Sequence, residues 1–135
     1  MKVELKSQSG STFLYLEYDP VNHWLYTNWI GFQSVDNVKE GYKEIINLRN
    51  TYNFIKLLND NRALIGPWDK ANKWLEQEII PVDDPHQIKY MAHVISPGIF
   101  GQLSVQDLQT RLQNKVEIKL FEDIKKAEEW LKSQE

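Results

Sequence analysis

The feature that most constrains the fold is a regular alternation of short apolar runs with amphipathic stretches along the whole chain. The strand-like runs lie at residues 3–6, 12–18, 23–30, 54–58, 88–95 and 116–121. Short turns separate the first three runs, which is typical of antiparallel pairing. Single stretches with helical periodicity separate the later runs, and strands joined in this way pair in parallel through right-handed crossovers. The sequence therefore predicts an α/β domain with a mainly parallel sheet of about five to six strands, four helices and an antiparallel N-terminal hairpin.

Each predicted helix begins at a residue type that favours a helix N-terminus. Ser and Asp side chains accept a hydrogen bond from the first turn, and proline suits the first helical position because it lacks an N–H. Ser104 and Asp107 together resemble a capping box. The four helices, the first of which spans 35–52, are predicted to begin at Ser34, Pro67, Ser104 and Asp123.

The composition is typical of one globular domain over residues 1–135. Sixteen Lys and Arg against nineteen Asp and Glu give a net charge of -3, which is not the clustered basic footprint of a nucleic-acid-binding protein. The absence of cysteine excludes disulfides, thiolate metal sites and cysteine nucleophiles. No apolar run is long enough to span a membrane and no signal peptide opens the sequence, so we expect a cytoplasmic protein.

Motifs for metal, nucleophilic and phosphate chemistry are missing from the sequence. No two of the three histidines are spaced to face one metal ion. Asp83-Asp84-Pro85-His86 holds three candidate ligands, but a solvated turn has the same composition. The nucleophile-elbow, P-loop and dinucleotide patterns are absent. We therefore expect no metal and no cofactor, and His93, between apolar residues in a predicted strand, is interpreted as a structural histidine.

Aromatic residues are concentrated in the N-terminal hairpin. Both faces of residues 13–18 are largely apolar, which favours a hairpin that is buried on both sides. The alternative is an apolar ligand pocket or a partner surface, and the partner could be a second copy of the chain. The residues concerned are Phe13, Tyr15, Trp24, Tyr26 and Trp29.

Several stretches resemble the SpoIIAA-like proteins, a group placed in the STAS superfamily and related to the CRAL-TRIO lipid-transfer domains. The resemblance covers nearly the whole chain and implies an α/β fold of the kind predicted above. Its better-known relatives, the anti-sigma factor antagonists and the STAS domains of transporters, work by binding proteins. The stretches are Leu58-Asn59-Asp60-Asn61-Arg62, Gly66-Pro67-Trp68, Trp74, Tyr90-Met91-Ala92-His93-Val94, and Phe121-Glu122-Asp123 with Ala127 and Trp130-Leu131.

One departure from the antagonists limits what the resemblance implies. In those proteins a serine at the start of the helix after the central strand is phosphorylated, and the added charge breaks the partner complex. This chain has no Ser or Thr between Thr51 and Ser96. The serine phospho-switch is therefore not expected here.

The primary hypothesis is a non-catalytic binding module that docks a protein partner or a small apolar ligand near the 59–68 loop. Ligands of open α/β sheets bind outside the carboxyl ends of the strands. Those ends are Gly31-Phe32-Gln33, residues 59–68, residues 96–100 and Phe121-Glu122-Asp123. The candidate site residues are Asp60, Asn61, Arg62, Trp68, Ser96 and Phe100.

Two of these residues have a structural alternative. Arg62 could bind an acidic group of a ligand, or form an ion pair with Asp60. Trp68 could line the site, or pack the second helix on the sheet. The alternative function is a small enzyme that uses His93 with Asp60 or Asp69.

Overall fold

A computed structural model describes residues 2–65, 69–79, 88–95, 99–112 and 115–134. These residues form one six-stranded sheet whose strands lie in sequence order from one edge to the other. The strands are β1 (Lys2–Lys6), β2 (Thr12–Asp19), β3 (Trp24–Trp29), β4 (Lys56–Asp60), β5 (Tyr90–Val94) and β6 (Glu117–Phe121). The helices are α1 (Val35–Tyr52), α2 (Asn72–Trp74), α3 (Ile99–Leu112) and α4 (Ile124–Lys132). A 3₁₀ turn at Asp69–Ala71 precedes α2, and a π-helical turn at Leu75–Ile79 follows it.

The strand pairing confirms the predicted fold class. β1 pairs with β2 and β2 with β3 in antiparallel orientation. β3, β4, β5 and β6 then pair in parallel. The N-terminal antiparallel part and the parallel part thus belong to one continuous sheet.

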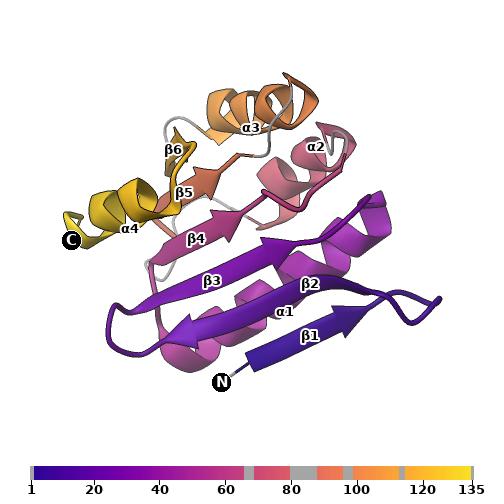
Figure 1. The fold of residues 1–135 in the computed structure, drawn as a ribbon, viewed down its shortest axis with the longest axis horizontal. Helices are drawn as coiled ribbons and strands as arrows, with labels where there is room; N and C mark the ends of the chain where they lie inside the picture. The colour runs from indigo at the N-terminus through magenta and orange to yellow at the C-terminus, as the bar shows by residue number, and fades with distance from the viewer. Residues whose placement is uncertain (1, 66–68, 80–87, 96–98, 113–114, 135) are drawn as a thin grey trace.

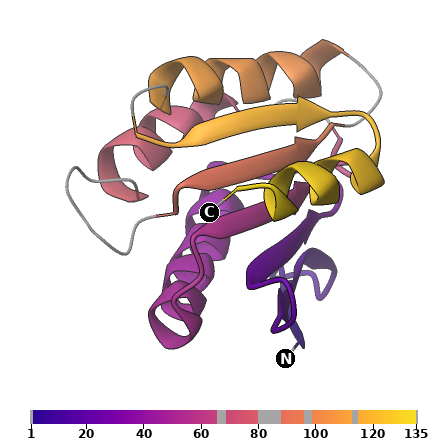
Figure 2. The ribbon, with the colours of Figure 1, turned by 90° about the vertical axis from the view of Figure 1, so that its left-hand side faces the viewer.

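The helices cover the two faces of the sheet unequally (Figures 1 and 2). α1, α2 and α3 each connect neighbouring parallel strands, and right-handed crossovers that advance in one direction place all three on the same face. α4 follows the last strand and packs on the opposite face against β4, β5 and β6. On this α4 face, no helix of the described residues covers β1 and β2.

Strand alternation divides the apolar residues between two cores. Successive side chains of a strand point to opposite faces, so Leu57 enters the larger core under α1, α2 and α3, and Leu58 enters the smaller core under α4. The larger core includes Leu14, Leu25, Ile45, Leu57 and Met91, all fully buried. The smaller core includes Trp24, Leu58, Ala92, Ala127 and Leu131.

Two predicted helix starts are confirmed by their hydrogen bonds. The Ser34 hydroxyl accepts from the Asn37 N–H at 3.0 Å at the start of α1. The Asp123 carboxylate accepts from the Lys125 N–H at 2.8 Å at the start of α4. Pro67, the predicted start of the second helix, lies outside the described residues.

The predicted start of the third helix is wrong. α3 begins at Ile99, so Ser104 lies in its interior and is buried. The Ser104 carbonyl oxygen and the Asp107 carboxylate both accept hydrogen bonds from the Asn72 amide, at 2.8 and 3.0 Å. The two residues that resemble a capping box instead bind α2 to α3, because tertiary contacts outweigh local capping preference.

The predicted limits of the fourth strand are also displaced. β4 spans Lys56–Asp60 instead of 54–58, and Phe54 packs near the Tyr18 ring before the strand begins. Asn59 and Asp60 stay in the strand because their side chains find buried partners, as described below.

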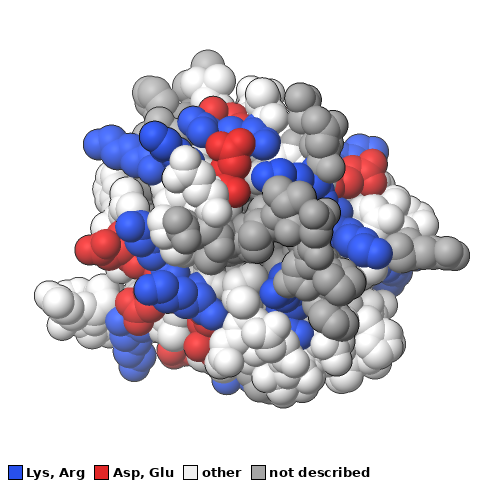
Figure 3. All heavy atoms as spheres, turned by 180° about the vertical axis from the view of Figure 1, so that it is seen from behind, with Lys and Arg blue, Asp and Glu red and all other residues white. Residues whose placement is uncertain are grey.

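The surface formed by α1, α2 and α3 carries Lys and Arg intermingled with Asp and Glu over its described part (Figure 3). Among the described residues, no helix combines the length and the apolar character that a membrane span requires.

Candidate functional site

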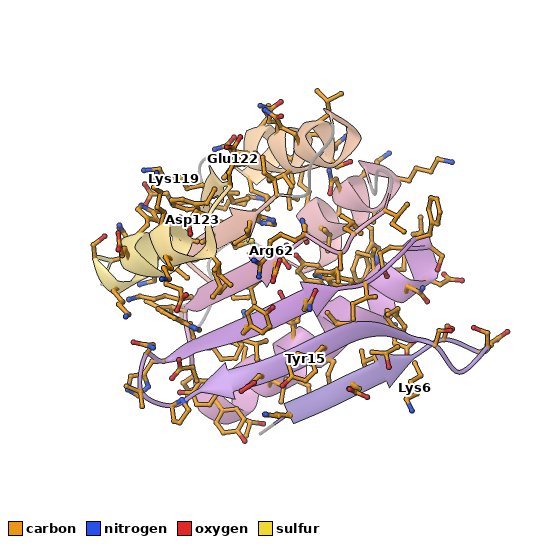
Figure 4. All side chains as sticks on the ribbon, in the orientation of Figure 1. Lys6, Tyr15, Arg62, Lys119, Glu122 and Asp123 are labelled. Atoms are coloured by element: carbon orange, nitrogen blue, oxygen red, sulfur yellow. The ribbon has the colours of Figure 1, made fainter. Side chains whose placement is uncertain are left out.

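The predicted site residues of β4 lie at the carboxyl end of a central strand. Asp60 ends β4, Asn61 follows it, and Arg62 lies in the next turn. Figure 4 shows Arg62 beside the end of β4, in the middle of the α4 face. Two other predicted residues, Trp68 and Ser96, lie outside the described residues. Phe100 lies in α3, but its side chain is not among the described ones.

The Asp60 carboxylate is buried and is held by two neighbouring side chains. It is only 2% exposed. The Arg62 guanidinium donates to it twice, from Nε to Oδ1 at 2.9 Å and from an Nη to Oδ2 at 2.8 Å. The Tyr26 hydroxyl donates to Oδ2 at 2.7 Å. The ion pair considered from the sequence is therefore present, with a buried carboxylate and an Arg62 side chain that is 51% exposed.

The three groups have defined charges at neutral pH. Burial alone would raise the pKa of the Asp60 carboxyl, but hydrogen bonds from Arg62 and Tyr26 outweigh it and hold that pKa below its usual value. Burial and the adjacent Asp60 carboxylate raise the pKa of the Tyr26 hydroxyl well above its usual value. Asp60 is therefore ionised and Tyr26 neutral, and the Arg62 guanidinium is fixed in one orientation.

Asn61 does not share this surface. Its side chain is buried, and neither amide atom has a hydrogen-bond partner in the described part of the chain. Its backbone N–H donates to the Val94 carbonyl at 2.8 Å, which continues the pairing of β4 with β5. Asn61 therefore belongs to the interior of the fold, whereas Arg62 lies at the surface.

An exposed apolar patch lies at the same end of β3 and β4. Gly31 donates to the Ala63 carbonyl at 2.9 Å and accepts from the Ile65 N–H at 3.1 Å, which extends the parallel pairing beyond the two strands. Leu64 turns into the core, so the residues on either side of it face outward. We define the Phe32 patch as Ile30, Phe32 and Ile65, which are 36%, 75% and 53% exposed.

Sequence reasoning placed Phe32 at the carboxyl end of its strand but did not select it as a site residue. Ile65 was covered only as part of the 59–68 loop. The signal that could have identified Phe32 and Ile65 is that both are bulky apolar residues in short connections after a strand, where side chains are usually exposed. The contact between the two connections depends on the strand order, which no local pattern gives.

A buried polar row crosses β3, β4 and β5 on the face covered by α1, α2 and α3. The Thr27 hydroxyl donates to Asn59 Oδ1 at 2.6 Å, and Asn59 Nδ2 lies 2.8 Å from His93 Nδ1. Because an amide nitrogen can only donate, His93 Nδ1 accepts, and the ring proton is on Nε2. All three side chains are fully buried. Burial lowers the pKa of His93 to about 4, so its ring is neutral at pH 7.

His93 and Asp60 lie on opposite faces of the sheet. His93 pairs with Asn59, whose neighbour Asp60 points to the α4 face. The two residues of the alternative enzyme hypothesis are therefore not brought together, and the Asp69 side chain lies outside the described ones. Within the described residues, no three His, Asp or Glu side chains gather in a way that could hold a metal ion. The Asp83-Asp84-Pro85-His86 loop lies outside them.

The aromatic hairpin is buried on one face and partly open on the other. Phe13 and Trp29 are buried in the larger core, and Trp24 is buried in the smaller core under α4. Tyr15 and Tyr26 are half-buried on the α4 face, with ring centroids 6.3 Å apart in an edge-to-face arrangement. The sheet surface around them, with Tyr15 labelled in Figure 4, is the part that α4 leaves uncovered.

The comparisons with known proteins support the fold. No model of a protein family matches the chain, and no curated protein does. Among solved structures, the chain is similar to an uncharacterised protein of the DUF3478 family with a SpoIIAA-like fold, from Shewanella loihica PV-4. The two share 17% identity with a TM-score of 0.61, over 87% of this chain and 91% of the other. The SpoIIAA-like fold implied by the sequence resemblance is thereby confirmed.

Proposed function

We propose that this chain is a non-catalytic binding module that docks a protein partner at the carboxyl ends of β3 and β4. The observation that carries the proposal is the Phe32 patch, because large apolar side chains held together in water are typical of interaction surfaces. The backbone hydrogen bonds that Gly31 donates to Ala63 and accepts from Ile65 hold the backbone of the patch in place. Because the backbone of the patch is already ordered, binding of a partner would cost little conformational entropy in this chain.

Arg62 supplies a polar contact on the same side of the sheet. A guanidinium has five N–H donors, and Asp60 takes two of them. The Tyr26 oxygen also interacts with the guanidinium, and the remaining donors belong to a side chain that is 51% exposed. We expect them to bind a carboxylate of the partner, because a guanidinium already fixed by a buried carboxylate is preorganised for a second one.

The shape of the surface favours a protein over a small apolar ligand. Phe32 and Ile65 are 75% and 53% exposed, and no member of the Phe32 patch lines either of two hollows formed by described residues. Side chains that project into solvent bury a small molecule poorly, whereas a protein segment can cover them. The arrangement does not favour catalysis by His93 with Asp60. His93 is buried on the other face, and the Asp60 carboxylate accepts hydrogen bonds from Arg62 and Tyr26.

The proposal is tested by comparing what three forms of the chain retain from an extract of cells that produce it. Phe32→Ser combined with Ile65→Ser should lose a protein that the wild type retains. Val21→Ser combined with Leu103→Ser is the matched control, since both residues are exposed and apolar but lie outside the patch.

The retained protein is then mixed with purified chain, and the complex is weighed by native mass spectrometry. Arg62→Ala should weaken that complex, and Arg111→Ala should not, because Arg111 pairs with Asp107 and Glu76 elsewhere. A complex of two copies of the chain would identify the partner as the chain itself. Equal loss from the patch variant and the control variant, or retention of a small molecule with no protein, would refute docking of a protein at this patch.

A further inference from the structure

A separate hollow lies on the α4 face, between the β2–β3 hairpin and α4. Its volume is about 310 Å³. Trp24, Tyr26 and Leu58 contribute to its lining from β3 and β4, and Ile124 contributes from the first turn of α4. Trp24 and Leu58 are buried, so the apolar surface that a small molecule can reach in this hollow comes from the half-buried Tyr26 and Ile124.

The polar part of the lining has one sign of charge. Three carboxylates border the hollow, from Glu17, Asp19 and Glu128, and no Lys or Arg of the described residues does. Burial would raise the pKa of Asp19, but hydrogen bonds from the Asn22 side chain and from backbone N–H groups hold it below its usual value. The positive charge of Lys132 also lowers the pKa of Asp19, but Lys132 lies outside the lining.

We propose that this hollow binds a small organic cation, an alkyl-substituted ammonium ion whose apolar groups contact Tyr26 and Ile124. Aromatic rings attract such cations through their electron-rich faces, and the surrounding carboxylates add a favourable potential. An anion would be repelled by the three carboxylates. A bare metal ion would gain nothing from Trp24, Leu58 and Ile124, since metal ions prefer converging oxygen or nitrogen ligands.

This inference is independent of the proposed protein docking. None of the residues that line the hollow belongs to the Phe32 patch, and Arg62 does not border it. Either proposal can therefore fail without affecting the other.

The test is an NMR titration of the full-length chain at low ionic strength with choline and with its uncharged carbon isostere, 3,3-dimethylbutan-1-ol. Choline should shift the backbone signals of Glu17, Trp24 and Ile124, and it should bind roughly fivefold more tightly than the isostere, because only choline carries the charge. Raising the salt concentration should weaken the binding of choline.

Glu128→Gln and Glu129→Gln separate the hollow from the general charge of α4. Both changes remove one negative charge from the same helix, but only Glu128 lines the hollow. Glu128→Gln should weaken choline binding by roughly threefold, and Glu129→Gln should leave it nearly unchanged. The proposal is overturned if choline causes no shifts at the hollow, if the isostere binds equally well, or if both variants weaken binding equally.

Discussion

The buried polar row predicts that this protein loses stability in mild acid because of one histidine. His93 accepts from Asn59 through Nδ1, and its Nε2 has no hydrogen-bond partner in the described part of the chain. Protonation would place a positive charge in a fully buried site. The folded protein therefore resists protonation, and burial lowers the pKa of His93 to about 4.

The sign and size of the effect follow from the two protonation equilibria. An unfolded histidine has a pKa of about 6.5, so between pH 6.5 and pH 4 the unfolded chain binds a proton that the folded protein does not. Stability is therefore full above this window and falls as the pH falls through it. Between pH 7 and pH 5, His93 should lower the free energy of unfolding by roughly 2 kcal/mol. The urea midpoint should fall by roughly 1 M.

The assay is urea unfolding of the wild type and of His93→Gln at pH 7 and pH 5. Glutamine has an oxygen that can accept from Asn59 but has no titrating group, so the variant should lose most of this pH dependence. His23→Asn is the matched control, because His23 is exposed and has a positive φ of 56° that asparagine tolerates. If the wild type and His93→Gln lose the same free energy between pH 7 and pH 5, His93 is not a buried neutral group and the reasoning is refuted.

Three further substitutions test other parts of the structure by urea unfolding. Asp60→Asn should cost about 1–3 kcal/mol at pH 7, because it removes the charge that binds Arg62. The lowered pKa of Asp60 means that its stabilisation is lost as the pH falls through that value, so wild type and variant should converge in acid. Gly41→Ala should destabilise by about 1 kcal/mol net, because the new methyl group would overlap the buried Trp29 ring and lie 2.8 Å from a Leu14 methyl group, which outweighs the gain in helix propensity. Asp123→Ala should cost about 1 kcal/mol through the lost cap of α4, and an equal loss from Glu122→Ala would contradict that assignment.

The fold class could be predicted from the sequence because the signals that define it are local. Periodicity distinguishes strands from helices, and single helices between strands imply parallel pairing. The errors occur where tertiary contacts override a local rule. Ser104 has the pattern of a cap but lies inside α3, because its carbonyl oxygen accepts from Asn72, 32 residues away. Asn59 and Asp60 are polar yet remain in β4, because partners on β3, β5 and the following turn satisfy them.

The candidate site could be located from the sequence but not resolved into faces. The strand-end rule leads to Asp60, Asn61 and Arg62 as a group. The side chains of these consecutive residues point in different directions, so Asp60 and Arg62 meet on the α4 face and Asn61 lies in the interior. The partnership between Tyr26 and Asp60, 34 residues apart, depends on the pairing of β3 with β4. Neither composition nor spacing contains that information.

Geometry alone explains why part of the sheet stays uncovered on the α4 face. Strands in a sheet are about 4.8 Å apart and a helix with its side chains is about 10 Å wide, so one helix covers about two strands. Three crossover helices can therefore cover a six-stranded sheet, and the polar row under them, with its neutral His93, is enclosed as part of the core. α4 is a single helix of nine residues on the opposite face, and it packs on β4, β5 and β6. Arg62, beside the end of β4, and the hollow between the β2–β3 hairpin and α4 lie at the border of the surface that α4 leaves uncovered. Binding at the carboxyl ends of β3 and β4 and binding in the hollow are thus both consistent with a topology that leaves one helix to cover the second face.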